Sequence, residues 1–448
     1  YGRWLRERLE LRRGLKRGFT FYGHEAGRRF FGDLLAGERE DEGRGISERR
    51  LLVAASPSDE LADTHWLRAD FDAEQVERAR AEGVVFQDRK EIVGLAFDAS
   101  GGALELALRP DTASHFRQWF AFRLEGAGRP RDLCITNASE SSFPNGWPGY
   151  RVMATTDGTR WRRVPTSYDG ETLHIRHAGQ EQPVLYAYFA TYPVARLDRL
   201  LDRIGKRRHV GLGIAGETVM GRAIPVVSCG EGQMPIWLVG RQHPGEVPAS
   251  FLMEGLLERL ANQEDGAVRL LLERATLYVA PLVDQDGAEL GNMRTNAAGT
   301  NLNRAWDDPD PEDAPEVAAL LAAMEETGVG LFFDVHADES SPFAFAAGSE
   351  GNPGVTEEIL EGEALLRAIL AEETVEFVDE PGYPIDEPGE ADLSCASNQV
   401  AERFDCPAIT LELPMKDTGD ARVPPGWSPA RAKRFGASLV DVLARYVI

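Results

Sequence analysis

The stretch MPIWLVGRQHPGEVPASFLMEGLLERL, residues 234–260, decides the fold of this chain. Its apolar run over residues 236–239 is typical of a buried strand, and a polar turn follows it. Pro248 stands where a helix can begin, and apolar residues then recur at helical spacing. The turn holds His243 and Glu246, so the stretch predicts a strand–turn–helix unit that presents both side chains at the end of a strand. Ligands of open α/β sheets bind at that end of the strands.

The composition narrows the class of protein. The 448 residues are enough for two or three domains, and 43% hydrophobic with 27% charged residues is typical of a soluble protein. No apolar run approaches the roughly 20 residues of a membrane span. The net charge of −24 argues against nucleic acid or membrane partners, and the sequence does not indicate an oligomeric state. Four scattered cysteines without CxxC spacing argue against a thiolate metal site and favour the cytoplasm.

The periodicity predicts three regions. Residues 1–90 are expected to be a partly disordered extension with one short helix over 72–81, and we assign them no function. Residues 91–195 show period-two patterning and the hairpin signals Asp157-Gly158 and Asp169-Gly170, which predict an antiparallel β-sandwich. Residues 196–448 alternate strands and helices and predict an α/β domain with a largely parallel or mixed sheet. Its expected strands after residue 260 cover 276–283, 330–335 and 408–413, and its expected helices cover 196–208, 314–326, 356–370, 392–404 and 428–447.

The segment GLGIAG, residues 211–216, matches the dinucleotide-binding pattern GxGxxG. That pattern requires a strand before it and a helix that opens within it. A basic run precedes the segment here, and no helical period follows. We therefore expect a strand-and-turn segment rather than a nucleotide site.

A second histidine lies at the end of another apolar strand. The segment LFFDVHAD places His336 there, with Asp334 two residues earlier and so on the same face. In this composition, a histidine followed by an acid three residues later occurs about once by chance. A solvated turn would explain His243 and Glu246 alone, and a structural histidine would explain His336 alone. Two imidazoles and one carboxylate, from His243, His336 and Glu246, nevertheless provide the three protein ligands of a catalytic zinc site.

Other polar residues follow or interrupt the predicted strands. Glu412 lies within the apolar segment AITLELP, where a nearby zinc ion or a structural arginine would compensate for its burial. Beside zinc it would act as general base toward the zinc-bound water. Arg304 suits bidentate binding of a carboxylate, and Asn303 adds a donor. Arg294 suits polarisation of a carbonyl and stabilisation of an oxyanion.

In this order, His243-Pro-Gly-Glu246, Arg294, Asn303-Arg304, His336 and Glu412 resemble the zinc metallocarboxypeptidase family. The short gap from Arg294 to Asn303 and the preceding sandwich, with WFAFRL (119–124) and GWPGYRV (146–152), resemble its cytosolic carboxypeptidase branch, especially the bacterial members. The likeness runs from about residue 92 to the end.

The resemblance implies a carboxypeptidase-like mixed sheet and one Zn²⁺ per chain on His243, Glu246 and His336. It also implies that the C-termini of peptides or proteins are the substrates. Ala337 and Asp338 follow His336, where many relatives have His-Gly-His or His-Ser-Tyr. For the family's substrate-capping tyrosine, the candidate is Tyr383, on a loop rich in proline and glycine.

The sequence leaves two rival functions open. One is a related zinc amidohydrolase or deacylase that acts on N-acyl amino acids or cell-wall peptides. The other is a catalytically silent zinc-containing binding protein. The large domain before the catalytic part favours a peptide substrate, and the presence of all metal and base residues argues against loss of activity.

Overall fold

The structure is a computed structural model of the chain. It describes residues 20–22, 95–98, 103–124, 130–179, 182–380, 382–417 and 422–448. The helix expected over residues 72–81, and all of the extension expected over residues 1–90 except 20–22, lie outside these residues. In the described part of the chain, no helix is both long and apolar enough to cross a membrane.

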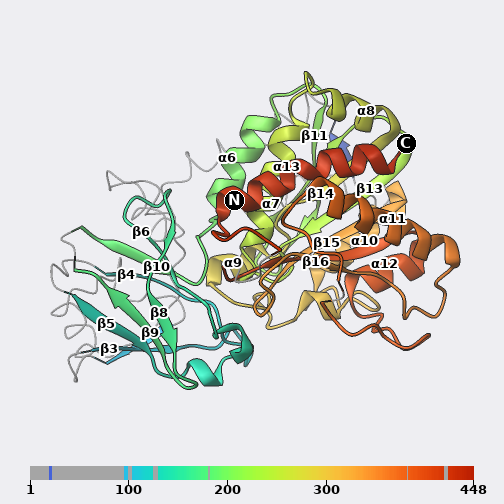
Figure 1. Cartoon of the computed structure of the whole chain (residues 1–448). Helices are drawn as coiled ribbons and strands as arrows, with labels where there is room; N and C mark the ends of the chain where they lie inside the picture. The colour runs from blue at the N-terminus through green and yellow to red at the C-terminus, as the bar shows by residue number, and fades with distance from the viewer. Residues whose placement is uncertain are drawn as a thin grey trace.

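A mixed sheet of eight strands forms the centre of the α/β part (Figure 1). Its spatial order is β1-β11-β12-β14-β13-β15-β17-β16. The strands are β1 (Thr20–Tyr22), β11 (Val210–Glu217), β12 (Ala223–Cys229), β13 (Met234–Gly240), β14 (Ala275–Ala280), β15 (Leu331–Asp338), β16 (Phe345–Ala347) and β17 (Ala408–Pro414). β14, β13, β15 and β17 run parallel, so their carboxyl ends meet at one edge. β11 covers the GLGIAG segment, which confirms the prediction of a strand there.

Helices cover both faces of this sheet. They are α6 (Val194–Ile204), α7 (Pro248–Leu260), α8 (Gly266–Arg274), α9 (Gln285–Leu290), α10 (Pro315–Thr327), α11 (Glu357–Glu373), α12 (Ala396–Phe404) and α13 (Pro429–Tyr446). Side chains of α7, α8, α11 and α13 join one apolar core with Ile236 and Leu238 of β13. Those of α10 and α12 join a second core with Trp237 and Val239. Successive side chains of β13 thus enter opposite cores, which explains why the whole run is apolar.

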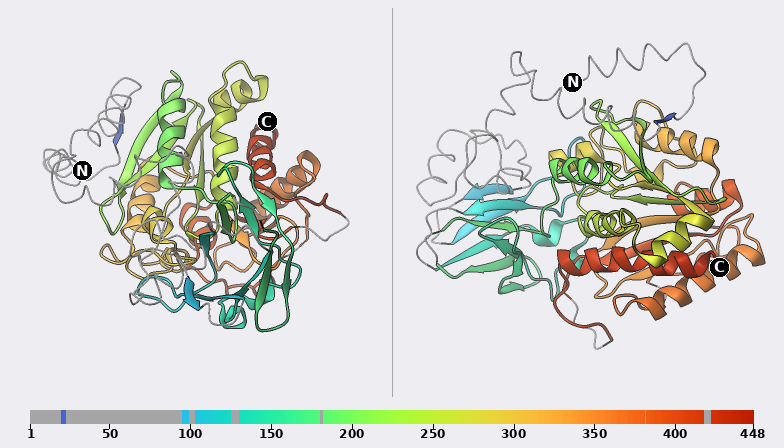
Figure 2. Two further views of the ribbon diagram at one scale, coloured as in Figure 1. Left: turned by 90° about the vertical axis from the view of Figure 1, so that its left-hand side faces the viewer. Right: turned by 90° about the horizontal axis from the view of Figure 1, so that it is seen from above.

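The N-terminal β-rich domain lies to one side of the α/β part (Figures 1 and 2). It has two sheets, with strand orders β4-β10-β6-β7 and β2-β3-β5-β9-β8. The strands are β2 (Leu95–Asp98), β3 (Leu104–Leu108), β4 (Ala121–Leu124), β5 (Arg131–Ile135), β6 (Met153–Thr155), β7 (Arg162–Arg163), β8 (Thr166–Tyr168), β9 (Leu173–His177) and β10 (Val184–Ala187).

One strand pair of this domain differs from the expected antiparallel sandwich. β3 and β5 are parallel, whereas every other described pair in these two sheets is antiparallel. The chain leaves β3, crosses to the other sheet as β4, and returns as β5 in the original direction. A parallel pair needs such a crossover connection, and period-two patterning alone does not reveal it.

The cysteine side chains form no disulfide. Cys134, Cys229, Cys395 and Cys406 are all free, and Cys134, Cys229 and Cys406 are buried. Burial raises the pKa of Cys229 to about 12, so this thiol stays protonated and behaves as a small apolar side chain.

Candidate active site

The turn after β13 is braced by a buried arginine. Arg241 has φ +60°, a left-handed conformation that is uncommon for residues other than glycine. Its guanidinium donates hydrogen bonds to the carbonyl oxygen of Pro244 at 2.6 Å and to Oγ of Ser250 at 2.8 Å. These bonds tie the turn to the first residues of α7 and compensate for the strained backbone. The braced turn carries His243 and Glu246 at the edge where the parallel strands end.

A close backbone approach joins this turn to a second loop. The Gly245 N–H donates to the carbonyl oxygen of Met293 at 2.8 Å. A Cβ at Gly245 would lie 2.4 Å from Sδ of Met293 and 2.8 Å from its carbonyl oxygen, so only glycine fits. The histidine turn and the loop that bears Arg294 are therefore held in a fixed relation.

The side chains of His243, Glu246 and His336 converge at one point. Nδ1 of His243 lies 2.6 Å from Oε1 of Glu246 and 3.1 Å from Nδ1 of His336. Nδ1 of His336 lies 2.8 Å from Oε2 of Glu246. All three residues are buried, and one ligand atom from each lies within 4.8 Å of the others. No other group of three or more metal-ligating side chains of this kind occurs in the described part of the chain.

The opposite nitrogen of each imidazole has its own partner. Nε2 of His243 lies 2.9 Å from Oδ1 of Asn301, and Nε2 of His336 lies 2.8 Å from Oδ2 of Asp334. Asp334 in turn accepts a hydrogen bond from Nε2 of Gln242 at 2.7 Å. The oxygen acceptor at Nε2 of His243 places the imidazole proton there and leaves Nδ1 of His243 available as a ligand, and the carboxylate of Asp334 close to Nε2 of His336 favours the same arrangement in that ring.

The donor set fits a zinc ion. In tetrahedral geometry, four ligand atoms about 2.1 Å from one ion lie about 3.4 Å from one another. The ligand atoms of His243, Glu246 and His336 therefore need to move apart by a few tenths of an ångström, and the closest pair by somewhat more. Burial and the charge of Arg294 lower the pKa of His243 to about 4, which keeps its imidazole neutral, as a metal ligand must be. Burial opposes ionisation of Glu246, but His243 and His336 hold the pKa of this carboxyl well below its usual value.

Glu412 lies directly beside the convergent group. β15 and β17 are parallel with His336 opposite Glu412 in the register, so both side chains leave the same face of the sheet. Burial raises the pKa of Glu412 to about 8, and the nearby His336 opposes that rise. Oε1 accepts a hydrogen bond from the hydroxyl of Tyr383 at 2.9 Å, whereas Oε2 is buried without a hydrogen-bond partner among the described residues. No arginine of the described chain pairs with Glu412, so the sequence-based alternative of a structural arginine pair does not apply.

The loop that bears Arg294 rests on the β-rich domain. Oδ2 of Asp111 accepts hydrogen bonds from the backbone N–H of Arg294 at 2.7 Å and of Thr295 at 3.0 Å. The guanidinium of Arg294 lies 5.5 Å from the ring centre of Phe116 and 5.4 Å from that of Phe143. These cation–π contacts fix the direction of the side chain and leave its N–H edge for a ligand.

Asn303 and Arg304, the two residues expected to bind a carboxylate, differ in how freely their side chains can move. Asn303 is buried, its Oδ1 accepts from the backbone N–H of Ala396 at 2.7 Å, and its Nδ2 lies 3.2 Å from Nε2 of His336. The side chain of Arg304 is 46% exposed, and its Nε lies 3.3 Å from Oδ2 of Asp392. Arg304 can therefore reorient toward a ligand more readily than Asn303.

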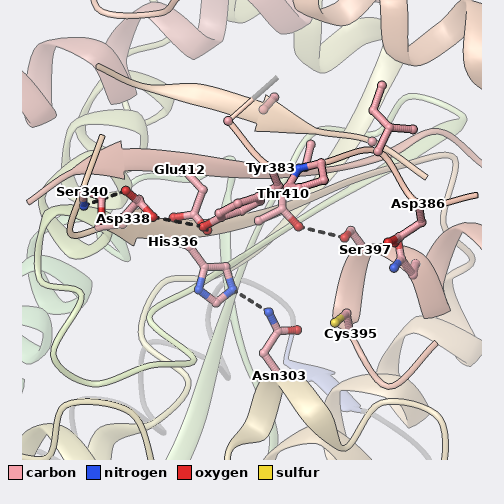
Figure 3. A pocket seen from close by; sticks show the side chains of 18 of the residues that line it. Asn303, His336, Asp338, Ser340, Tyr383, Asp386, Cys395, Ser397, Thr410 and Glu412 are labelled. Carbon is pink, nitrogen blue, oxygen red and sulfur yellow. Dashed lines mark hydrogen bonds between the residues drawn. The ribbon is translucent and has the colours of Figure 1, made fainter. Parts of the chain in front are cut away.

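A cavity of about 580 Å³ collects these side chains. All eight residues singled out from the sequence line it: His243, Glu246, Arg294, Asn303, Arg304, His336, Tyr383 and Glu412. Figure 3 shows Glu412 and Tyr383 above the ring of His336, with Asn303 below it. The hydroxyl of Tyr383 lies against Glu412 and, at 3.4 Å, against Oδ2 of Asp338.

Sequence reasoning gave no role to several residues that shape the site. Asn301 lies two positions before Asn303, and its carboxamide was the available signal. Asp334 was noted on the face of His336, but its contact with Nε2 was not predicted. Asp111 has no signal in the sequence, because it acts on backbone amides more than 180 residues away.

Comparison with known proteins agrees with this geometry. Residues 91–189 match the cytosolic carboxypeptidase N-terminal domain, and residues 198–345 match the zinc carboxypeptidase family. A metallo-carboxypeptidase from Pseudomonas aeruginosa, solved in complex with (2-guanidinoethylmercapto)succinic acid, is 40% identical with a TM-score of 0.75. The match covers 80% of this chain and 97% of that one.

Two relatives known from sequence show the same likeness. An uncharacterized protein of Zymomonas mobilis is 38% identical over 352 residues, which cover 78% of this chain and 93% of the relative. Human cytosolic carboxypeptidase 6 is 27% identical over 306 residues, which cover 61% of this chain and 60% of the relative. The chain belongs to the zinc carboxypeptidase family and carries the N-terminal domain of the cytosolic carboxypeptidases.

Proposed function

We propose that the protein is a zinc-dependent carboxypeptidase that hydrolyses the C-terminal peptide bond of peptide or protein substrates. One observation carries this proposal. The convergent group of His243, Glu246 and His336 shares a cavity with Glu412, a buried carboxyl that has one oxygen without a partner. Ligands for one metal ion beside an uncommitted acid are the minimum set for metal-assisted hydrolysis.

Each side chain of the cavity has a chemical task in this proposal. A zinc ion on the three ligands, when bound, supplies Lewis-acid polarisation and lowers the pKa of water to about 7. Glu412 takes the proton from the attacking water and passes it to the leaving amine. The positive charge of a bound ion would lower the pKa of Glu412 from about 8 toward 7. A carboxyl with a pKa near 7 can both take up and release a proton at neutral pH, as the two steps require. Arg294 donates to the oxygen that gains negative charge.

The substrate's C-terminal carboxylate would be bound by Arg304, assisted by Asn303. Arg304 offers two parallel N–H donors, which match a carboxylate in a bidentate pair. Tyr383 would then leave Glu412 and cover the bound substrate, because its hydroxyl now occupies the position where water must meet the carboxylate. The loop from residue 382 to residue 390 is exposed, which permits that movement.

The test compares peptide hydrolysis by the zinc-loaded chain, the chelated chain and the Glu412→Gln variant. Removal of the metal should abolish turnover, and its return should restore it. Loss of the base should lower kcat by about 10²- to 10⁴-fold while zinc stays bound. Glu361→Gln, on the exposed side of α11, makes the same change of charge and should have no effect.

Other outcomes would select a rival function. Turnover that survives chelation or Glu412→Gln would contradict the mechanism. Cleavage of N-acyl amino acids in preference to peptides would identify a deacylase. Stoichiometric zinc without turnover of any peptide would identify a binding protein.

We also propose a division of the chain and a location for it. The division places the β-sandwich at residues 91–195 and the catalytic domain at residues 196–448, and the packing of α6 on α7 and α9 supports it.

A cytoplasmic location is supported by the free cysteines and by relatives named as cytosolic. Limited proteolysis and cell fractionation would test these two statements.

A further inference from the structure

The end of the cavity next to the β-rich domain holds a buried carboxyl that the proposed reaction does not use. Glu339 directly follows β15, lines the cavity and is only 6% exposed. Its carboxyl accepts the N–H of its own residue, whereas Oε1 has no hydrogen-bond partner among the described residues. A buried carboxyl oxygen without a partner is unfavourable, so a ligand that donates an N–H to it would be bound favourably.

The β-rich domain closes over Glu339. The 3-10 helix η2 (Pro144–Gly146) of that domain packs against it, because a Cβ at Gly146 would lie 2.8 Å from Cβ of Glu339 and 3.1 Å from its carbonyl oxygen. A residue larger than glycine would force Glu339 to move. Phe143, just before η2, also lines the cavity, and its ring centre lies 5.4 Å from the guanidinium of Arg294. The same segment therefore buries Glu339 and contacts Arg294.

The surrounding charges place the Glu339 carboxyl near the reacting groups. Burial raises its pKa well above the ordinary value, the charges of Glu246 and Asp338 add to that rise, and Arg294 opposes it. The carboxyl is therefore within electrostatic range of a metal ligand and of the arginine proposed to bind the scissile carbonyl. One of its oxygens can accept an N–H whether the carboxyl is ionised or protonated.

The position of Arg304 sets the direction of a bound peptide. Burial raises the pKa of the Cys395 thiol and the charge of Arg304 opposes that rise, so the two side chains are neighbours. Figure 3 shows Cys395 on one side of the His336 ring and Asp338 on the other. A peptide with its C-terminal carboxylate at Arg304 therefore runs past the convergent group toward Asp338 and Glu339.

We propose that Glu339 binds the backbone N–H of the residue that precedes the C-terminal residue of the substrate. This inference rests on the proposed function and adds a substrate-binding residue to it. The scissile carbonyl, which Arg294 would bind, belongs to that same residue, and its N–H lies one Cα further from the C-terminus. The contact is to the main chain, so it serves peptides with different side chains and fixes their register in the cavity.

The test compares two blocked tripeptides on the zinc-loaded full chain. They are identical except that an ester oxygen replaces this N–H in one of them, a change that adds no bulk and leaves the scissile bond intact. We expect kcat/KM for the amide to exceed that for the ester by about tenfold or more, mainly through KM, because the hydrogen bond forms on binding.

Variants assign this advantage to one residue. Glu339→Ala should remove most of the amide advantage, whereas Glu339→Gln keeps an acceptor oxygen and should retain part of it. Glu390→Gln, which changes an exposed acid outside the cavity, should leave the ratio as it is in the unmodified chain. If alanine at residue 339 prevents folding, Glu339→Gln gives the same comparison with a smaller loss.

A binding measurement separates this inference from the proposed function. Calorimetry on the zinc-loaded Glu412→Gln chain compares the two peptides without turnover. Tighter binding of the amide that the further change Glu339→Ala abolishes supports the inference even if the unmodified chain cleaves no peptide. Equal binding of the two peptides, no binding of either, or an amide advantage that survives Glu339→Ala overturns it. Failure of the unmodified chain to cleave any peptide, by contrast, counts against the proposed function.

Discussion

Asn301 contacts the convergent group of His243, Glu246 and His336 without belonging to it. Its Oδ1 lies 2.9 Å from Nε2 of His243 and also accepts the backbone N–H of Asn303 at 3.1 Å. This one oxygen sets the tautomer and the ring orientation of His243 and also shapes the turn that carries Arg304. Outer partners of this kind tune metal affinity as effectively as some direct ligands do.

Asn301→Ala should therefore weaken zinc binding by about 10- to 100-fold without unfolding the chain. The measurement is competition with a chromophoric chelator at fixed pH. Asn262→Ala removes a comparable surface contact far from the site and should leave the affinity unchanged. An affinity equal to that of the unmodified chain would show that Asn301 does not orient the ligand.

The site could be predicted from the sequence only where residue type and strand position coincide. His336 and Glu412 were found because each polar side chain interrupts or ends an apolar strand. The brace from Arg241 could not be found, since it depends on a left-handed backbone conformation that no neighbouring residue indicates. Asp111 could not be found either, because a contact between a side chain and distant backbone amides leaves no periodic pattern.

Two helices of one face, α7 and α13, pack with their backbones in contact. In α13, a Cβ at Gly436 would lie 1.8 Å from the carbonyl oxygen of Leu252 in α7. In α7, a Cβ at Gly255 would lie 1.9 Å from the carbonyl oxygen of Lys433. Paired glycines thus allow the two helices to approach more closely than side chains would permit. The helix that begins after the turn bearing His243 and Glu246 is held in place by this contact.

Gly436→Ala should lower the free energy of unfolding by about 2 kcal/mol or more. The gain in helix propensity, about 1 kcal/mol, is too small to offset a clash with a backbone atom. Gly266→Ala is the matched control, since its Cβ would lie 3.8 Å from the nearest atom outside its own helix backbone. Urea unfolding of both metal-free variants provides the comparison. Equal midpoints for the two would contradict the close packing.

The long periodic elements were the predictable part of the fold. A helix was expected over residues 428–447 and is found at Pro429–Tyr446, and a strand expected over 408–413 is found at Ala408–Pro414. α8 and α9 were missed, since one has nine residues and the other six, too few for a clear helical period. The parallel pairing of β3 and β5 was missed because pairing depends on the path between strands.

Across the whole molecule, acidic residues outnumber basic ones, and some of them are buried. Glu316 is fully buried, and burial raises its pKa to about 7. Burial likewise raises the pKa of Asp284 and of Asp286. The folded state therefore binds protons that the unfolded state releases, so stability should fall as the pH rises from about 4.5 to about 7.

Glu316→Gln should flatten this decline. The rise of the Glu316 pKa to about 7 corresponds to a change of about 3 kcal/mol in the free energy of unfolding across this pH range. The measurement is the free energy of unfolding of the metal-free chain at pH 5, 6, 7 and 8. Glu312→Gln, an exposed acid just before the same helix, should keep the original slope. Parallel curves for the unmodified chain and Glu316→Gln would exclude Glu316 as the source.

The hydrogen bonds between Asp111 and the loop that bears Arg294 have an evolutionary consequence. Three successive amides of the catalytic part, from Met293 to Thr295, depend on one carboxylate supplied by the β-rich domain. The two parts are therefore not interchangeable modules, and recombination between distant lineages would succeed only if the incoming partner brought an acid to that place. Loss of the acid at Asp111 would leave three amides of the catalytic part without their acceptor, whichever side chains stand at residues 293–295.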